Sequence, residues 1–195
     1  MKRALLGILL LASVSCGDMV RQGTGSSYLI VNALEAKSGA DSSAEFSGVL
    51  RSDVVTMIED VSTIFDDPAR VTFQLALKDP GPAGSPATPS TNNFITIDRY
   101  RVEFVRADGR NVPGVDVPYA FDGAFTATVA DTAEVGFTLV RHQAKNEAPL
   151  TSLRRTPSFI STIARVTFYG RDQTGREVIA TAQMGVNFGD FADPE

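Results

Sequence analysis

The chain has a single cysteine, a single histidine and no tryptophan among its 195 residues. One cysteine excludes a disulfide within the chain, and one cysteine with one histidine cannot supply the four ligands of a His/Cys zinc site. Basic residues are also few, 18 against 23 acidic ones, and the only adjacent basic pairs are Lys2-Arg3 and Arg154-Arg155. Because an acidic surface repels a phosphate backbone, we expect no nucleic-acid partner.

The sequence also lacks an apolar run long enough to cross a bilayer as a helix, since its N-terminal run, residues 4–12, has only nine residues. With 43% hydrophobic and 21% charged residues, the composition is that of a globular domain. We therefore divide the chain into a signal peptide (1–15), a polar tether (16–27), a single domain (28–190) and a tail (191–195).

Residues 1–16 (MKRALLGILLLASVSC) have the parts of a secretory signal peptide: a short basic start, an apolar core and small residues before the expected cut. They resemble the signal of bacterial lipoproteins, which ends in an aliphatic residue, a small residue, Gly or Ala, and then Cys. Ser13 and Ser15 depart from this consensus. They also satisfy the rule for ordinary secretory cleavage, so plain secretion and an uncleaved anchor are the alternatives.

The lipoprotein resemblance implies acyl chains on Cys16, the only cysteine of the chain. Each buried CH₂ contributes about 0.8 kcal/mol, so more than one chain gives stable anchoring to a membrane. Gly17 follows the cysteine, in place of the Asp that retains some lipoproteins of Gram-negative bacteria at the inner membrane. The resemblance therefore implies an exported, membrane-anchored lipoprotein, with the outer membrane favoured, on its periplasmic face or at the cell surface.

Alternating apolar and polar residues predict β-strands along the rest of the chain. In the clearest case, residues 69–78, Val71 and Phe73 share one face while Thr72 takes the other. Short strands of this kind separated by Gly/Pro turns predict an all-β fold, an antiparallel β-sandwich of seven to eight strands with long loops. A closed barrel is the alternative. The predicted core residues are Val71, Phe73, Leu75, Tyr100, Val102, Phe104, Phe137, Leu139, Val166 and Phe168.

Two segments interrupt this pattern. Residues 54–65 also fit helical spacing, but their β-branched residues favour a strand that runs into a loop. Residues 79–93 contain four prolines and two glycines, which predicts a long exposed loop that no sheet can continue through.

The last segment, residues 159–188, reads as a long hairpin with its turn at residues 171–175. It resembles the closing strand pair of bacterial immunoglobulin-like and fibronectin-like domains, in which an alternating strand, a D-x-x-G turn and a second alternating strand end near the C-terminus. This resemblance implies an immunoglobulin-like topology. The paired cysteines and core tryptophan of antibody-type domains are absent.

No catalytic constellation stands out. His142 is the only candidate acid–base near neutral pH, but no G-x-S-x-G motif accompanies it. Adjacent acids such as Asp66-Asp67 point to opposite faces of a strand and make poor acid–base couples. We expect no enzymatic activity, no cofactor and no metal site. A calcium site is the alternative. Its oxygen ligands would come from four aspartates in predicted loops: Asp108, Asp116, Asp122 and Asp131.

Four residues are candidates for contact with a partner. Arg99 and Arg101 alternate with apolar residues on one strand and could recognise an anion, whereas Tyr119 and Phe121 lie in a proline-flanked loop and could offer an aromatic contact. The sequence favours a lipid-anchored cell-envelope protein, a non-enzymatic β-sandwich that binds or scaffolds an envelope protein or a glycan. A carbohydrate-binding module or an accessory subunit of an envelope complex is the alternative.

Overall fold

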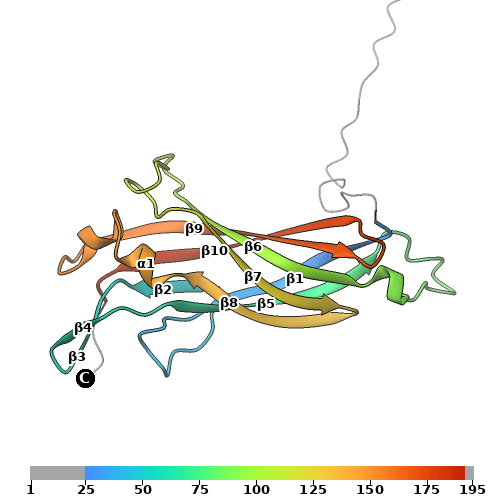
Figure 1. Cartoon of the computed structure of the whole chain (residues 1–195), viewed down its shortest axis with the longest axis horizontal. Helices are drawn as coiled ribbons and strands as arrows, with labels where there is room; N and C mark the ends of the chain where they lie inside the picture. The colour runs from blue at the N-terminus through green and yellow to red at the C-terminus, as the bar shows by residue number, and fades with distance from the viewer. Residues whose placement is uncertain (1–24, 192–195) are drawn as a thin grey trace, which may run out of the picture.

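A computed structural model of the chain describes residues 25–191 and contains two β-sheets packed face to face (Figure 1). The smaller sheet has three antiparallel strands in the order β1-β5-β8: Ser27–Ala36, Asp67–Leu77 and Thr132–Val140. The larger sheet has five strands in the order β2-β10-β9-β6-β7: Val49–Asp53, Glu177–Gly189, Phe159–Asp172, Ile95–Val105 and Phe121–Val129.

The all-β class is confirmed, and the presence of two separate sheets shows that the closed-barrel alternative is wrong. One pair departs from the expected antiparallel pattern: β2 runs parallel to β10, from Val49 opposite Gly185 to Asp53 opposite Gly189. β9 and β10 form the expected long antiparallel hairpin. The immunoglobulin-like topology stays a prediction.

The core lies between the two sheets and is rich in phenylalanine. The ring of Phe73 on β5 meets that of Phe168 on β9 edge-on, with centroids 4.9 Å apart, and Tyr100 on β6 meets Phe137 on β8 at the same distance. Nine of the ten predicted core residues are buried, and Phe137 is partly buried against them. Alternation along each strand therefore identifies the inward face correctly.

Residues 54–65 form a small two-stranded hairpin, β3 (Thr56–Ile58) and β4 (Val61–Thr63), so the helical alternative is wrong. Glu59 and Asp60 make its turn with φ of 48° and 64°. Both values are left-handed, as a type I′ hairpin turn requires. This hairpin projects beyond the two main sheets at the lower left of Figure 1.

Short helical turns complete the fold. The segment between β8 and β9 contains α1 (His142–Lys145) and the 3₁₀ turn η2 (Leu150–Leu153), and η1 (Thr91–Asn93) ends the proline-rich loop. That loop, residues 79–93, is almost wholly exposed, as predicted. No helix within residues 25–191 is long and apolar enough to cross a membrane.

The sandwich is elongated and its two ends differ (Figure 1). At the end where β1 begins, which we call the tether end, the carbonyl of Ser26 accepts a hydrogen bond of 2.9 Å from the backbone N–H of Lys78. Ser27 Oγ donates a hydrogen bond of 2.7 Å to the carbonyl of Asn93. The chain thus enters β1 beside the proline-rich loop and the β9–β10 turn. The distal end carries the β3–β4 hairpin, the loop 106–120 and the segment 141–158.

Candidate functional site

The two predicted arginines lie on the outer face of β6, where carboxylates accompany them. Arg101 donates to Asp122 at 2.9 Å and to Glu103 at 3.0 Å, and these contacts, the one from Glu103 foremost, raise the pKa of its guanidinium. Arg99 lies 3.7 Å from the same Asp122 and stacks on the ring of Tyr169, 4.1 Å from its centroid. Because Asp122 neutralises both cations in part, this face is a poor site for an anion.

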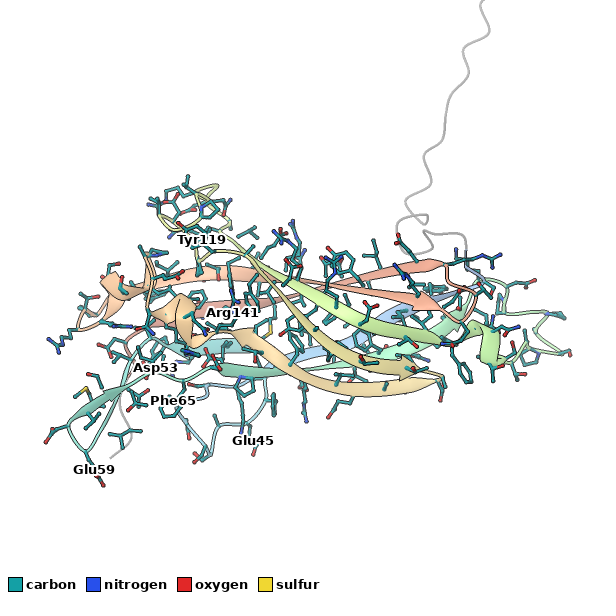
Figure 2. The ribbon with its side chains drawn as sticks, viewed as in Figure 1. Glu45, Asp53, Glu59, Phe65, Tyr119 and Arg141 are labelled. Atoms are coloured by element: carbon teal, nitrogen blue, oxygen red, sulfur yellow. The ribbon has the colours of Figure 1, made fainter. Side chains whose placement is uncertain are left out.

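The two predicted aromatic residues do not act together. Tyr119, in the loop 106–120, is 54% exposed, whereas Phe121, the first residue of β7, is 5% exposed. Phe121 lies under the guanidinium of Arg141, which is 4.1 Å from the ring centroid. Phe121 is therefore a core residue, and Tyr119 alone remains available to a partner (Figure 2). The fifth predicted residue, Cys16, lies outside the described residues.

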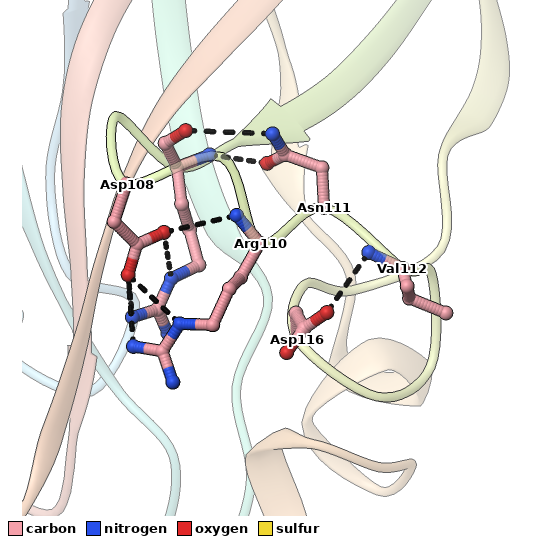
Figure 3. A network of polar contacts seen from close by, with 6 residues as sticks. Asp108, Arg110, Asn111, Val112 and Asp116 are labelled. Carbon is pink, nitrogen blue, oxygen red and sulfur yellow. Dashed lines mark hydrogen bonds and ion pairs between the residues drawn. The ribbon is translucent and has the colours of Figure 1, made fainter.

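The four loop aspartates are not brought together either. Asp108 bridges Arg106 and Arg110 at 2.6 and 2.8 Å, and hydrogen bonds from these two side chains hold its pKa well below the usual range (Figure 3). Asp116 instead accepts from the backbone N–H of Val112, 3.1 Å. Among residues 25–191, no group of three His, Cys, Asp or Glu side chains could hold a metal ion.

His142 begins α1 and pairs with Asp66 just before β5. Its Nδ1 lies 3.0 Å from Asp66 Oδ1, and both side chains are about half exposed, 48% and 49%. Asp67, the next residue, points the other way into the core, as adjacent positions at a strand should. The two acids of this pair therefore serve different surroundings, as the sequence predicts.

Asp67 takes part in a buried ion pair that the sequence does not predict. Lys145 Nζ donates to Asp67 Oδ1 at 2.9 Å, and both side chains are fully buried. The backbone N–H of Gly39 donates to the same oxygen at 2.9 Å, while Ser52 Oγ donates to Oδ2 at 2.6 Å. Burial raises the pKa of the Asp67 carboxyl, and Lys145 opposes that change. The loop 37–47, β2, the start of β5 and the more distant α1 thus meet at one carboxyl group.

The segment 141–158 holds Lys145 in this position. Leu150 and Leu153 of η2 are buried in the core, which fixes the segment to the end of the sandwich. The guanidinium of Arg154 donates to the carbonyl of Lys145 and to Asn146 Oδ1, both at 2.8 Å. The single turn of α1 is therefore supported by tertiary contacts, because a helix this short is not stable alone.

A cleft of about 530 Å³ lies between the loop 37–47 and β2, an edge strand of the larger sheet. Its walls carry both signs of charge, from Lys37 and Arg51 and from Asp41, Glu45 and Asp53. Asp53 lines the cleft and is itself buried; it accepts from Thr56 Oγ1 at 2.6 Å and from the N–H of Phe191 at 3.0 Å. Burial raises the pKa of Asp53. Figure 2 shows Asp53 near the root of the hairpin and Glu45 on the loop.

Exposed apolar side chains are concentrated at the distal end. Of the ten large apolar residues that are exposed among those described, seven belong to the β3–β4 hairpin, the loop 106–120 and the start of β9. We call these seven the distal apolar residues: Met57, Ile58, Val61, Val112, Val115, Tyr119 and Phe159. These seven side chains come from three separate segments of the same end of the sandwich rather than from one continuous patch.

The sequence matches no protein-family model, no curated protein and no solved structure. A cleft of mixed charge and the distal apolar residues suit non-covalent recognition, because protein interfaces combine an apolar centre with a polar rim.

Proposed function

We propose that this protein is a lipid-anchored binding module of the bacterial cell envelope, which presents its distal end to a partner protein. One observation carries the proposal: β1 begins at one end of the elongated sandwich, and the distal apolar residues lie at the other (Figure 1). An anchor attached before β1 would therefore leave the partner-facing end pointing away from the membrane. An accessory subunit of an envelope complex fits the same geometry.

The anchor in this proposal is Cys16, which follows the apolar signal core. The nine residues from Gly17 to Gly25, which precede the hydrogen-bonded Ser26 and Ser27, span roughly 30 Å when extended at about 3.3 Å each. That reach sets the domain clear of the membrane surface, with its distal end directed away from the membrane. Acylation of the cysteine would supply the apolar surface that holds the protein in place.

The partner in this proposal is a protein, because the distal apolar residues sit among charged groups rather than in a row of aromatic rings. Met57 and Ile58 lead into the acidic turn Glu59-Asp60, and Val61 follows it. Such alternation of apolar and charged side chains suits a protein interface. On the outer sheet face, by comparison, Tyr169 is covered by the guanidinium of Arg99, which leaves its ring poorly placed to stack on a sugar.

The anchor is tested by Cys16→Ser, which removes the acylated thiol. We expect the variant to move from the membrane fraction to the soluble fraction, while Ser15→Ala, which brings the site closer to the lipoprotein consensus, stays in the membrane. An intact mass that shows an unmodified Cys16 at the N-terminus of the wild type would rule out the lipoprotein.

The distal end is tested by photo-crosslinking in cells. A photoreactive residue at Val61 or at Tyr119, both exposed, should give an adduct with one protein of defined size. The matched control is Ser85, which is also exposed but lies in the proline-rich loop at the tether end. Adducts from position 85 alone, or the same adducts from all three positions, would contradict a partner-facing distal end.

A further inference from the structure

The buried pair of Lys145 and Asp67 is an unusual arrangement of charge. Both side chains are fully buried, and one oxygen of the carboxyl group lies 2.9 Å from the lysine nitrogen. Removing an ammonium and a carboxylate from water costs several kcal/mol per ion, and their attraction offsets this cost only when every donor and acceptor is satisfied. The hydrogen bonds around the two groups therefore decide whether the charged pair is their most stable form.

The donor count does not favour an ammonium ion. A lysine ammonium has three N–H donors. Among the described residues, Lys145 Nζ has one hydrogen-bond acceptor, Asp67 Oδ1. In the amide formed from the same lysine, Oδ1 becomes the amide's own carbonyl oxygen. One N–H is then left without an acceptor among the described residues, against two in the ammonium, and the nitrogen carries no charge. The surroundings of Nζ thus suit an amide better than an ammonium.

The carboxyl group is held in a way that suits attack by an amine. Oδ1 accepts from the backbone N–H of Gly39, which can stabilise negative charge that develops on that oxygen. Oδ2 accepts from the hydroxyl of Ser52 at 2.6 Å, so a proton donor lies on the other oxygen. Burial also raises the pKa of Asp67, which favours the neutral acid over the unreactive carboxylate.

We propose that Lys145 and Asp67 condense to form an intramolecular amide bond. The ammonium passes one proton to the carboxylate, and the neutral amine attacks Cγ of Asp67. The new bond joins Nζ to Cγ, the bond from Cγ to Oδ2 breaks, and Oδ2 leaves as water after protonation through Ser52. Of the three hydrogens of the ammonium, one stays on the amide and two leave in the water, so no oxidant, reductant or cofactor is needed.

The folded chain holds the lysine amine against the carboxyl group of Asp67. Two groups held in contact in this way react as if each were present at very high concentration. The product removes two charges from the interior while it keeps the hydrogen bond from Gly39. It also joins residues 78 positions apart, so that the segment 141–158 is fixed covalently to the first residue of β5. This inference does not depend on the proposed binding function.

The test is a tryptic digest of the denatured, full-length wild-type protein, analysed by mass spectrometry. If the amide forms, trypsin cannot cleave after Lys145, and the peptide of residues 52–70 appears joined to that of residues 142–154. The joined mass should equal the sum of the two peptides less one water. Fragmentation should place the link on Asp67 and not on Asp66. Release of residues 142–145 as a free peptide, with residues 52–70 unlinked, would overturn the proposal.

Two variants serve as controls. Lys145→Arg keeps a positive charge, but a guanidinium does not form the amide, so the joined peptide should disappear. Asp66→Asn changes the neighbouring exposed acid and should keep the joined peptide, altered only by the mass of the substitution. Loss of the link in Asp66→Asn, or its persistence in Lys145→Arg, would show that the bond is elsewhere and overturn the assignment.

Discussion

At the scale of single residues, the phenylalanines between the sheets should contribute most to stability. Phe73 and Phe168 are buried and meet edge-on at 4.9 Å. We expect Phe73→Ala and Phe168→Ala each to lower the free energy of unfolding by about 3–5 kcal/mol, as for other buried aromatic truncations. Thr72→Ala and Thr167→Ala, on the opposite faces of the same strands, should change it little.

Urea denaturation of the four variants measures this contrast. The double variant Phe73→Ala/Phe168→Ala should lose less than the sum of the single losses, since the two rings share a contact. Equal losses from the threonine and phenylalanine variants would mean that the inward and outward faces have been exchanged.

The buried carboxyl of Asp53 gives a prediction about pH. Its pKa is raised from 3.8 by burial, so the folded state binds the proton more tightly than the unfolded chain does. The contribution of Asp53 to the free energy of unfolding is therefore most favourable below pH 3.8, and it falls as the pH rises through the raised pKa of the folded state. Asp53→Asn removes this loss.

Unfolding free energies of the wild type and of Asp53→Asn, compared from acid to neutral pH, measure the effect. The amide can still accept from the N–H of Phe191, so the variant should gain stability relative to the wild type as the pH rises. The control is Asp60→Asn, which removes the same kind of charge from a side chain that is exposed rather than buried. A difference for Asp53→Asn that is flat with pH would contradict a raised pKa.

The candidate site shows which residues a sequence can and cannot identify. Alternation places Val71 and Phe73 in the core because the signal lies within a few neighbouring positions. The partnership of Asp67 with Lys145 has no local signal: Asp67 precedes Pro68 and resembles a turn residue, and its partner is 78 positions away. The prolines before Phe121 predict an exposed loop, but Phe121 begins β7 and is buried.

At the scale of elements, the proline-rich loop should be replaceable, provided that its end is kept. Residues 80–89 are exposed or nearly so, whereas Ser90 and Asn93 cap η1, and Asn93 contacts Ser26 and Ser27. Replacing residues 80–89 with a shorter Gly/Ser linker should change the free energy of unfolding by less than about 1 kcal/mol, because the cost of closing a loop varies slowly with its length.

Thermal and urea unfolding of two replacements test this prediction. A replacement that extends through Asn93 should cost clearly more than one that stops at residue 89, since it removes the hydrogen bonds to the start of β1. Loss of several kcal/mol from the shorter replacement would show that residues 80–89 pack on the sandwich.

The β3–β4 hairpin shows why elements without standard turn residues are hard to predict from sequence. Its turn needs two left-handed residues, which usually means Asn-Gly or Asp-Gly, but the chain has Glu59-Asp60 there. Strands of three residues are also too short for alternation to be recognised. The long β9–β10 hairpin, with Gly175 at φ 84° in its turn, carries both signals, and its prediction is confirmed.

At the scale of the whole molecule, the all-β sandwich follows from many strands of similar length, but the pairing of β2 with β10 does not. β2 reaches the larger sheet because the loop 37–47 separates it from β1, which stays in the smaller sheet. The chain thus changes sheets within a dozen residues, and nothing local indicates a parallel partner some 136 positions away at Gly185. Topology depends on packing that only the folded chain reveals.

The shared core predicts that both ends of the sandwich unfold together. One cluster of buried residues extends from Phe73 and Phe168 to Phe104 and Phe188, whose rings are 5.3 Å apart. We expect the soluble Cys16→Ser protein to unfold in a single transition, with near-UV signals from its tyrosines and far-UV signals from its strands giving the same midpoint. Phe73→Ala and Phe188→Ala should lower that one midpoint together. Two separate midpoints in either variant would show that residues 28–190 are not a single domain.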